Sequence, residues 1–163
     1  SKDRLIPDFF RALKVKETLQ IRSPKATRPW QHVLEPISGY LMLAEKLVDK
    51  GEDYAEAWNF GPDENNIKSV SQILEYLYKT IKGSNWSVEK KSQLHEAIFL
   101  NINSSKAQSR LGWTHRWDLE TGLNKTIEWY KAWLDHEDLM SITNLQIDEY
   151  EKTLKNDKLV NEA

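Results

Sequence analysis

Apolar residues recur every three or four positions in six stretches of the chain, which predicts amphipathic helices. The predicted helices cover residues 4–13, 35–50, 69–82, 104–111, 118–134 and 141–154. Pro7 is tolerated in the first of them, because the N–H groups of a first helical turn have no helical partner. Asp118 is the expected N-cap of the fifth helix. Gly51, Gly83 and Gly112 are typical helix ends.

Four shorter segments have the apolar or alternating character of β-strands. They cover residues 18–21, 55–60, 85–89 and 98–100. The dipeptide Gly61-Pro62 ends the second of these, because both residues break regular structure. The pattern therefore predicts an α/β fold that is rich in helix and has a few short strands. We expect one lobe of residues 1–155, followed by a polar tail of residues 156–163.

The segment Ile21–Pro36 is a cationic loop that contains three prolines. Proline fixes φ and interrupts helices, so we expect an ordered loop here. Its cations are Arg22, Lys25 and Arg28, and Trp30 can anchor it by packing. Arginine offers a planar fork of donors that matches phosphate oxygens, so the loop suits a fixed anion such as a diphosphate. The alternative is a solvated basic loop held by a buried tryptophan.

Composition narrows the classes of function. The 163 residues include 23 basic and 25 acidic side chains, and this near balance lacks the basic footprint of a nucleic-acid-binding protein. No apolar run approaches the roughly 18 residues that would span a bilayer. The chain contains no cysteine, which excludes disulfides and thiolate chemistry and fits a reducing compartment. We therefore expect a cytoplasmic protein that binds neither nucleic acid nor membrane.

The four histidines do not form a metal site by spacing, since no pair has helical i, i+4 spacing with a carboxylate. His32 alternates with Val33, so one of the two is expected to be buried, and a structural histidine is the favoured interpretation. His115 and His136 are isolated, and we expect both to be exposed. His95 lies in a loop, where it either contacts a ligand or bonds to the backbone.

A Tyr-x-x-x-Lys spacing occurs once, at Tyr78 and Lys82. In short-chain dehydrogenases such a pair activates the tyrosine, and a glycine-rich turn seats the dinucleotide. Here the pair lies on a predicted amphipathic helix, with Tyr78 expected to pack inward, and no glycine turn precedes it. We interpret the spacing as a coincidence and expect no catalytic residue and no cofactor-binding residue in this chain.

Several segments carry a more specific signal through their order along the chain. They are Arg-Leu-Ile-Pro-Asp at residues 4–8, Arg-Pro-Trp-Gln-His-Val-Leu-Glu-Pro at 28–36, Ser-Gly-Tyr-Leu at 38–41, Trp-Asn-Phe-Gly at 58–61 and Asn-Ser-Ser-Lys-Ala with Leu-Gly-Trp at 103–113. Together they resemble the CDP-glucose 4,6-dehydratase family of extended short-chain dehydrogenases. The family usually has aspartate where Asn103 stands, so one charged contact is expected to be weaker here.

This resemblance implies the carboxyl-terminal part of a longer enzyme, namely its nucleotide-sugar-binding lobe. The full enzyme would use NAD to remove water from CDP-glucose, giving CDP-4-dehydro-6-deoxy-glucose. The expected partners are a CDP-sugar and the missing amino-terminal cofactor lobe, with a homo-oligomer left open. NAD would belong to the complete enzyme, and this chain alone would bind none and be inactive.

The resemblance also implies which residues contact the substrate. The expected set consists of Arg28, Asn59, His95, Glu96, Leu5, Pro7, Arg22 and Trp30. Arg28 would contact the diphosphate, Asn59 would hold the same ligand from a strand end, and His95 or Glu96 would lie toward the base or ribose. Two other functions compete with this one. The chain could belong to another nucleotide-sugar dehydratase or epimerase, or it could be a non-catalytic interaction module that keeps the fold.

Overall fold

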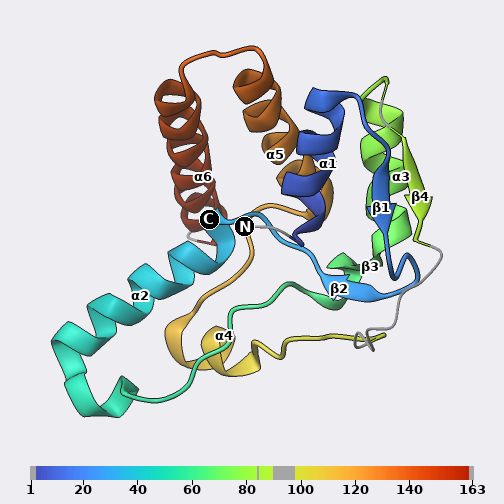
Figure 1. Ribbon diagram of the computed structural model, residues 1–163. Helices are drawn as coiled ribbons and strands as arrows, with labels where there is room; N and C mark the ends of the chain where they lie inside the picture. The colour runs from blue at the N-terminus through green and yellow to red at the C-terminus, as the bar shows by residue number, and fades with distance from the viewer. Residues whose placement is uncertain (1–2, 84, 90–97, 162–163) are drawn as a thin grey trace. The chain divides into compact units, whose positions relative to one another are not determined.

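The computed structural model describes residues 3–83, 85–89 and 98–161, and the chain divides into two compact units (Figure 1). The first unit consists of Ser1–Pro29 and Ile67–Asn101, and the second of Trp30–Asn66 and Ile102–Ala163. Each unit contains two separate stretches of the chain. The expected lobe of residues 1–155 with a tail of residues 156–163 stays a prediction. The fold is helix-rich with a few short strands, as the hydrophobic pattern predicts.

The first unit combines two helices with two small sheets. Its elements are α1 (Leu5–Val15), β1 (Leu19–Ile21), β2 (Thr27–Pro29), β3 (Ile67–Ser69), α3 (Val70–Thr80) and β4 (Trp86–Val88). Strands β1 and β4 are parallel, whereas β2 and β3 are antiparallel. Figure 1 shows α1 and α3 beside the β1–β4 pair. Four of these elements agree with sequence expectations, and β2 and β3 were not expected.

Apolar side chains from α1 and α3 form the centre of this unit. Phe10, Leu74 and Leu77 are fully buried. Helix α3 begins with a capping box, in which the Ser69 hydroxyl accepts from the Gln72 amide and the Gln72 side chain accepts from the Ser69 N–H. Such reciprocal bonds satisfy donors that a helix start leaves unpaired. The amphipathic pattern and the cap together explain why this helix begins where the sequence predicts.

The second unit is helical throughout its regular structure. Its elements are α2 (Leu34–Lys50), the 3₁₀ helices η1 (Gly51–Tyr54) and η2 (Glu64–Asn66), α4 (Ser105–Leu111), α5 (Leu119–Leu134) and α6 (Leu139–Asn161). Helices α5 and α6 lie side by side as an antiparallel pair (Figure 1). Asp118 caps α5 by accepting from the Thr121 amide at 2.8 Å, as predicted. Helix α6 continues through most of the expected tail.

Two of the predicted strands are wrong. Residues 55–60 are irregular, and residues 98–100 contribute only one isolated bridge, between Thr27 and Phe99. A strand exists only where another strand completes its hydrogen bonds, and no described residue of the second unit is in a strand. Backbone groups at the end of residues 55–60 bond to side chains instead. The Phe60 carbonyl accepts from Gln31 at 2.8 Å, and the Gly61 N–H donates to Ser104 at 2.6 Å.

Aromatic rings fill the core of the second unit. Phe60 packs edge-to-face on Trp113 at 5.3 Å and on Tyr40 at 5.4 Å, measured between ring centroids. The Leu-Gly-Trp motif ends α4 and delivers Trp113 to this core, where it is 1% exposed. On the α5–α6 pair, the Trp129 indole donates to Thr143 at 3.0 Å. Trp129 of α5 thus packs against the neighbouring helix α6.

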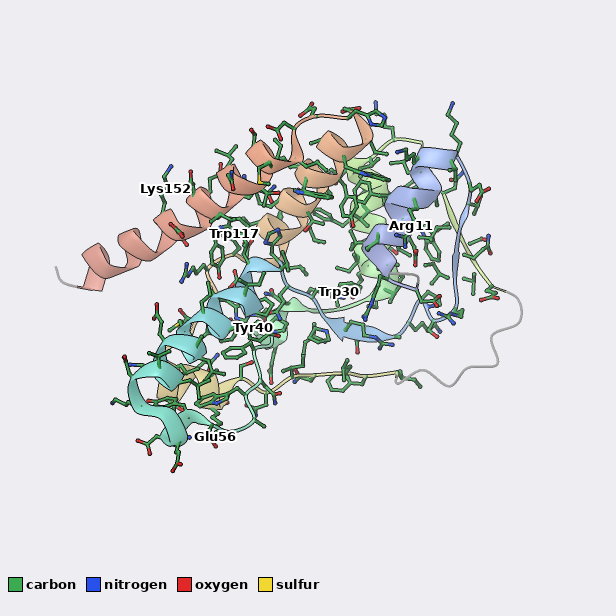
Figure 2. The ribbon with its side chains drawn as sticks, turned by 60° about the vertical axis from the view of Figure 1, so that its left-hand side comes forward. Arg11, Trp30, Tyr40, Glu56, Trp117 and Lys152 are labelled. Carbon is green, nitrogen blue, oxygen red and sulfur yellow. The ribbon has the colours of Figure 1, made fainter. Side chains whose placement is uncertain are left out.

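A buried carboxylate ties α2 to the later part of the same unit. Glu35 is fully buried and accepts from the Trp117 amide at 2.9 Å and from the Tyr150 hydroxyl at 2.8 Å. The Arg116 amide adds a longer contact of 3.3 Å. Burial and the neighbouring Glu35 raise the pKa of Tyr150, so its hydroxyl stays protonated and donates. Trp117, which is labelled in Figure 2, packs edge-to-face on the Tyr150 ring with 5.0 Å between the ring centroids.

Gly39 lets α2 approach this core closely. A Cβ atom at position 39 would lie 2.3 Å from the Phe60 ring, which is itself fixed between Tyr40 and Trp113. Alanine in a helix interior normally gains about 1 kcal/mol over glycine. We expect the opposite for Gly39→Ala, a loss of about 1–3 kcal/mol in the free energy of unfolding, because overpacking outweighs helix propensity. Urea unfolding would measure the change.

The control on the same helix is Leu41→Ala. Leu41 is 63% exposed, so its replacement leaves the packing around the Phe60 ring unchanged. Equal stability of Gly39→Ala and the Leu41→Ala control would contradict the overpacking argument.

Candidate basic site and the Asn59 segment

The predicted cationic loop is ordered because its carbonyls bond to the start of α3. The Ala26 carbonyl accepts from the Val70 amide at 3.0 Å, and the Pro24 carbonyl accepts from the Ser71 amide at 2.9 Å. These amides are among the four N–H groups that a helix start leaves without helical partners. The loop therefore has a fixed backbone within the first unit, as its prolines suggest.

Arg28 lies in the middle of β2, directly opposite Lys68 of β3. Directly opposed residues of antiparallel strands place their side chains on the same face of the sheet, a few ångströms apart. The Arg28 guanidinium also donates to the Thr27 carbonyl at 2.8 Å. Like charges in register are unfavourable by themselves, and a bound anion would reverse that effect. Lys68 is a candidate site residue that the sequence did not reveal, because β3 has no visible strand pattern.

Arg22, Leu5 and Pro7 of the expected set have ordinary structural surroundings in the first unit. Arg22 forms an ion pair with Asp3 at 3.0 Å, and Asp3 is largely exposed. Leu5 and Pro7 lie in the first turn of α1 and are half-buried. His95 and Glu96 lie outside the described residues, so their expected role stays a prediction.

Asn59 belongs to the second unit, where its side chain is exposed. Hydrogen bonds to side chains fix the backbone of the two residues that follow Asn59. Phe60 is anchored by Gln31, while the Ser104 hydroxyl accepts from the Gly61 N–H and donates to the Gly61 carbonyl at 3.0 Å. The structure thus presents Asn59 from a fixed backbone, although not from the strand that the sequence predicts.

Trp30 is half-buried, and its backbone N–H donates to the Asn66 carbonyl at 3.3 Å. The expected role of Trp30 as a packing anchor stays a prediction. Two residues later, the His32 ring is buried and packs on the Trp117 ring, with 4.9 Å between the ring centroids. Val33 is 60% exposed, which confirms His32 as the buried member of the pair.

Burial, with a smaller contribution from Lys125, lowers the pKa of His32 from 6.5 to about 4. The unfolded chain then binds a proton more readily than the folded chain as the pH falls from 6.5 to about 4. We expect the free energy of unfolding to fall over this interval by up to about 3 kcal/mol, at 1.36 kcal/mol per pKa unit. Urea unfolding at several pH values would measure it.

The matched variants are His32→Asn and His136→Asn. Asparagine can keep the acceptor that His32 Nδ1 offers to the Leu34 amide, but it does not titrate. His136 is exposed at a positive φ that asparagine tolerates. Wild type and His136→Asn should lose stability on acidification more steeply than His32→Asn. Parallel curves for all three proteins would contradict the prediction.

Two expectations about single side chains are wrong. His115 is not exposed: its side chain is 93% buried, and its Nε2 atom lies 3.0 Å from Gln31 Oε1. Tyr78 does not pack inward, since it is 52% exposed. Both errors concern which side of a segment faces the core, which depends on neighbours that are distant in sequence. His136 is exposed, as expected.

The described glycines do not form the turn that a dinucleotide site uses. Such a site needs a glycine turn that follows a strand and opens a helix, so that backbone N–H groups can meet a pyrophosphate. The six glycines lie instead within α2 and α5, at helix ends, in the irregular segment after Phe60, or before β4. Tyr78 lies in α3, which no glycine turn opens, and Lys82 lies beyond the end of this helix. Across the same ranges, no group of three potential ligands could hold a metal ion.

In the described ranges, every helix is too short or too polar to cross a bilayer.

No family model matches the chain. Over 152 residues, or 92% of its length, the chain is 40% identical to the CDP-glucose 4,6-dehydratase of Salmonella typhimurium. It spans 42% of that relative, less than half of its length. The match confirms the resemblance predicted from the ordered motifs, and the partial coverage agrees with part of a longer enzyme.

Proposed function

We propose that this chain is the nucleotide-sugar-binding part of a CDP-glucose 4,6-dehydratase. The observation that carries the proposal is the identity to such an enzyme along nearly the whole chain. The complete enzyme would oxidise C4 of the CDP-bound glucose, eliminate water across C5 and C6, and return the hydride to C6. The cofactor NAD and the proton-transfer groups would lie in a cofactor lobe outside these residues, and the assembled enzyme would be cytoplasmic.

Within the chain, the basic face of β2 and β3 is the proposed contact for the diphosphate. Arg28 and Lys68 would neutralise its charge, and the guanidinium would add bidentate hydrogen bonds. The resemblance assigns Asn59 to the ligand as well, and the Asn59 side chain is exposed on a fixed backbone of the second unit. His95, Glu96, Leu5, Pro7, Arg22 and Trp30 complete the proposed substrate-binding set.

The direct test is titration of CDP, UDP and GDP into the purified chain, followed by NMR. We expect saturable binding of CDP, weaker binding of the other two, and no response to NAD. Incubation with CDP-glucose should give no loss of water by mass spectrometry. Tighter binding of UDP or GDP would instead favour another nucleotide-sugar dehydratase or epimerase. Turnover by the chain alone would overturn the assignment of catalysis to a separate lobe.

The alternative of a non-catalytic interaction module has one observation in its favour. Helix α2, with Val33 directly before it, carries exposed apolar side chains at spacings of three, four and seven, which place them on one face. Tyr40 of this set is labelled in Figure 2. The set consists of Val33, Ile37, Tyr40, Leu41, Leu47 and Val48. A contiguous apolar face of this kind marks a contact surface, and a cofactor lobe would cover it equally well.

We therefore expect the isolated chain to self-associate as its concentration rises. Sedimentation velocity would detect this as an increase in the weight-average sedimentation coefficient. Leu41→Lys should suppress association because it places a charge in the apolar face, whereas Glu45→Lys on an exposed position of the same helix should have a smaller effect. A concentration-independent monomer for the wild-type chain would contradict the prediction.

A further inference from the structure

A buried chain of side-chain hydrogen bonds lies behind Asn59. Gln31 donates through Nε2 to the Phe60 carbonyl at 2.8 Å, and its Oε1 lies 3.0 Å from His115 Nε2. The His115 side chain is 7% exposed, and its ring packs on Trp113 at 4.7 Å. The three residues come from distant parts of the sequence but from the same compact unit. The whole arrangement is thus fixed within that unit.

The chemistry of the bonded groups decides which atom donates and which accepts in each of these hydrogen bonds. The Phe60 carbonyl can only accept, so the amide nitrogen of Gln31 must face it. The amide oxygen of Gln31 then faces His115, and because this oxygen can only accept, His115 Nε2 must carry a proton. His115 Nδ1 is buried without a hydrogen-bond partner in the described structure, and the nearest carboxylate, of Asp63, is 4.0 Å away. His115 therefore forms a side-chain hydrogen bond through Nε2 and none through Nδ1 in the described structure.

This chain of bonds links two segments that the proposed function assigns to the ligand. Gln31 lies in the Arg28–Val33 motif next to Trp30, and Phe60 follows Asn59 directly. On the far side, Ser104 holds both polar groups of Gly61. Without His115, the Gln31 amide could rotate, and the Phe60 carbonyl would lose a donor with the correct orientation.

We propose that His115 is a positioning residue for nucleotide-sugar binding, which fixes the Gln31 amide so that Gln31 holds Phe60 and presents Asn59. This inference rests on the proposed function, because it assumes that Asn59 contacts the ligand. It assigns His115 no contact with the ligand, since its ring is enclosed by protein.

The test compares two replacements of His115 that differ in reach. The amide nitrogen of glutamine can occupy the position of Nε2, so His115→Gln keeps the donor to Gln31. The amide nitrogen of asparagine reaches only the position of Nδ1, so His115→Asn loses that donor. His136→Asn is the matched control at an exposed histidine. Each protein is measured free and during titration with CDP.

In the free wild-type protein, long-range ¹H–¹⁵N correlations should show His115 protonated at Nε2 and not at Nδ1. Hydrogen exchange of the Gly61 amide should be faster in His115→Asn and unchanged in the other proteins. CDP affinity should fall about tenfold in His115→Asn, the loss of roughly one oriented hydrogen bond, and stay within about twofold of wild type in His115→Gln. A merely structural role would weaken both variants alike.

Three results would overturn the inference. They are an Nδ1-protonated tautomer, equal CDP affinity of wild type and His115→Asn, and failure of His115→Gln to restore binding. Failure of the wild-type chain to bind CDP would overturn the proposed function and the positioning role together. That failure is distinguishable, because the tautomer and the Gly61 exchange rate are measured without CDP.

Discussion

Glu35→Ala is expected to lower the free energy of unfolding by about 3–5 kcal/mol, as removal of one partner from a buried charged network does elsewhere. The carboxylate is fully buried and accepts bonds from Trp117, Tyr150 and Arg116. Without it, two backbone N–H groups and a hydroxyl lose their acceptor, and each unsatisfied buried donor costs about 1–3 kcal/mol. Domains of this size are stable by only about 5–15 kcal/mol, so the second unit would be close to unfolding.

The measurement is urea unfolding followed by tryptophan fluorescence, which reports the indoles of Trp113 and Trp117 in this network. Glu35→Gln should lose less than Glu35→Ala, because the amide keeps one oxygen acceptor. Glu45→Ala is the matched control, since Glu45 lies exposed on the same helix. A loss in Glu35→Ala no larger than that in Glu45→Ala would show that the network does not hold the unit together.

The helices could be predicted because their signals are local. Helix α3 carries its cap at Ser69 and Gln72 and its apolar face within eleven residues, so no distant partner was needed to recognise it. Helix α5 is similar, with Asp118 immediately before the first turn. Each signal is a property of consecutive residues, and tertiary contacts reinforced it.

Strands depended on partners that the sequence does not identify. Residues 55–60 have strand composition but no neighbouring strand, and their last residues bond to Gln31 and Ser104 instead. Strand β2 shows the reverse case. It has three residues, includes a proline, and exists because β3 lies opposite it about forty positions later. Neither outcome follows from alternation of apolar and polar residues.

The same limit applies to single side chains of the candidate site. His115 follows a tryptophan in a motif that ends a short helix, and nothing nearby in the sequence indicates that Gln31 will meet its ring. The resemblance named Arg28 and Asn59, whereas it could not name Lys68, His115 or Ser104 as their supports. The roles of the named residues in binding stay predictions, for which the structure supplies defined surroundings.

Arg28→Ala is expected to weaken CDP binding by roughly ten- to a hundredfold, because a charge-assisted contact contributes on the order of 1.5–3 kcal/mol. Arg28→Lys should recover only part of the loss, since an ammonium cannot reproduce the planar fork of donors. Lys68→Ala should also weaken binding, by a smaller factor, because it removes a point charge from the same face of the sheet. Titration calorimetry or NMR would measure all three.

Lys25→Ala is the matched control, because Lys25 is an exposed cation of the same loop and lies outside the β2–β3 register. It should stay within about twofold of wild type, as expected for an exposed charge screened by salt. If Lys25→Ala weakened binding as much as Arg28→Ala, a diffuse positive field would explain the affinity better than a defined site. Raising the salt concentration separates these cases further. Bidentate bonds at Arg28 should keep Arg28→Ala weaker than wild type at high salt, whereas a purely electrostatic loop would bring the two affinities together.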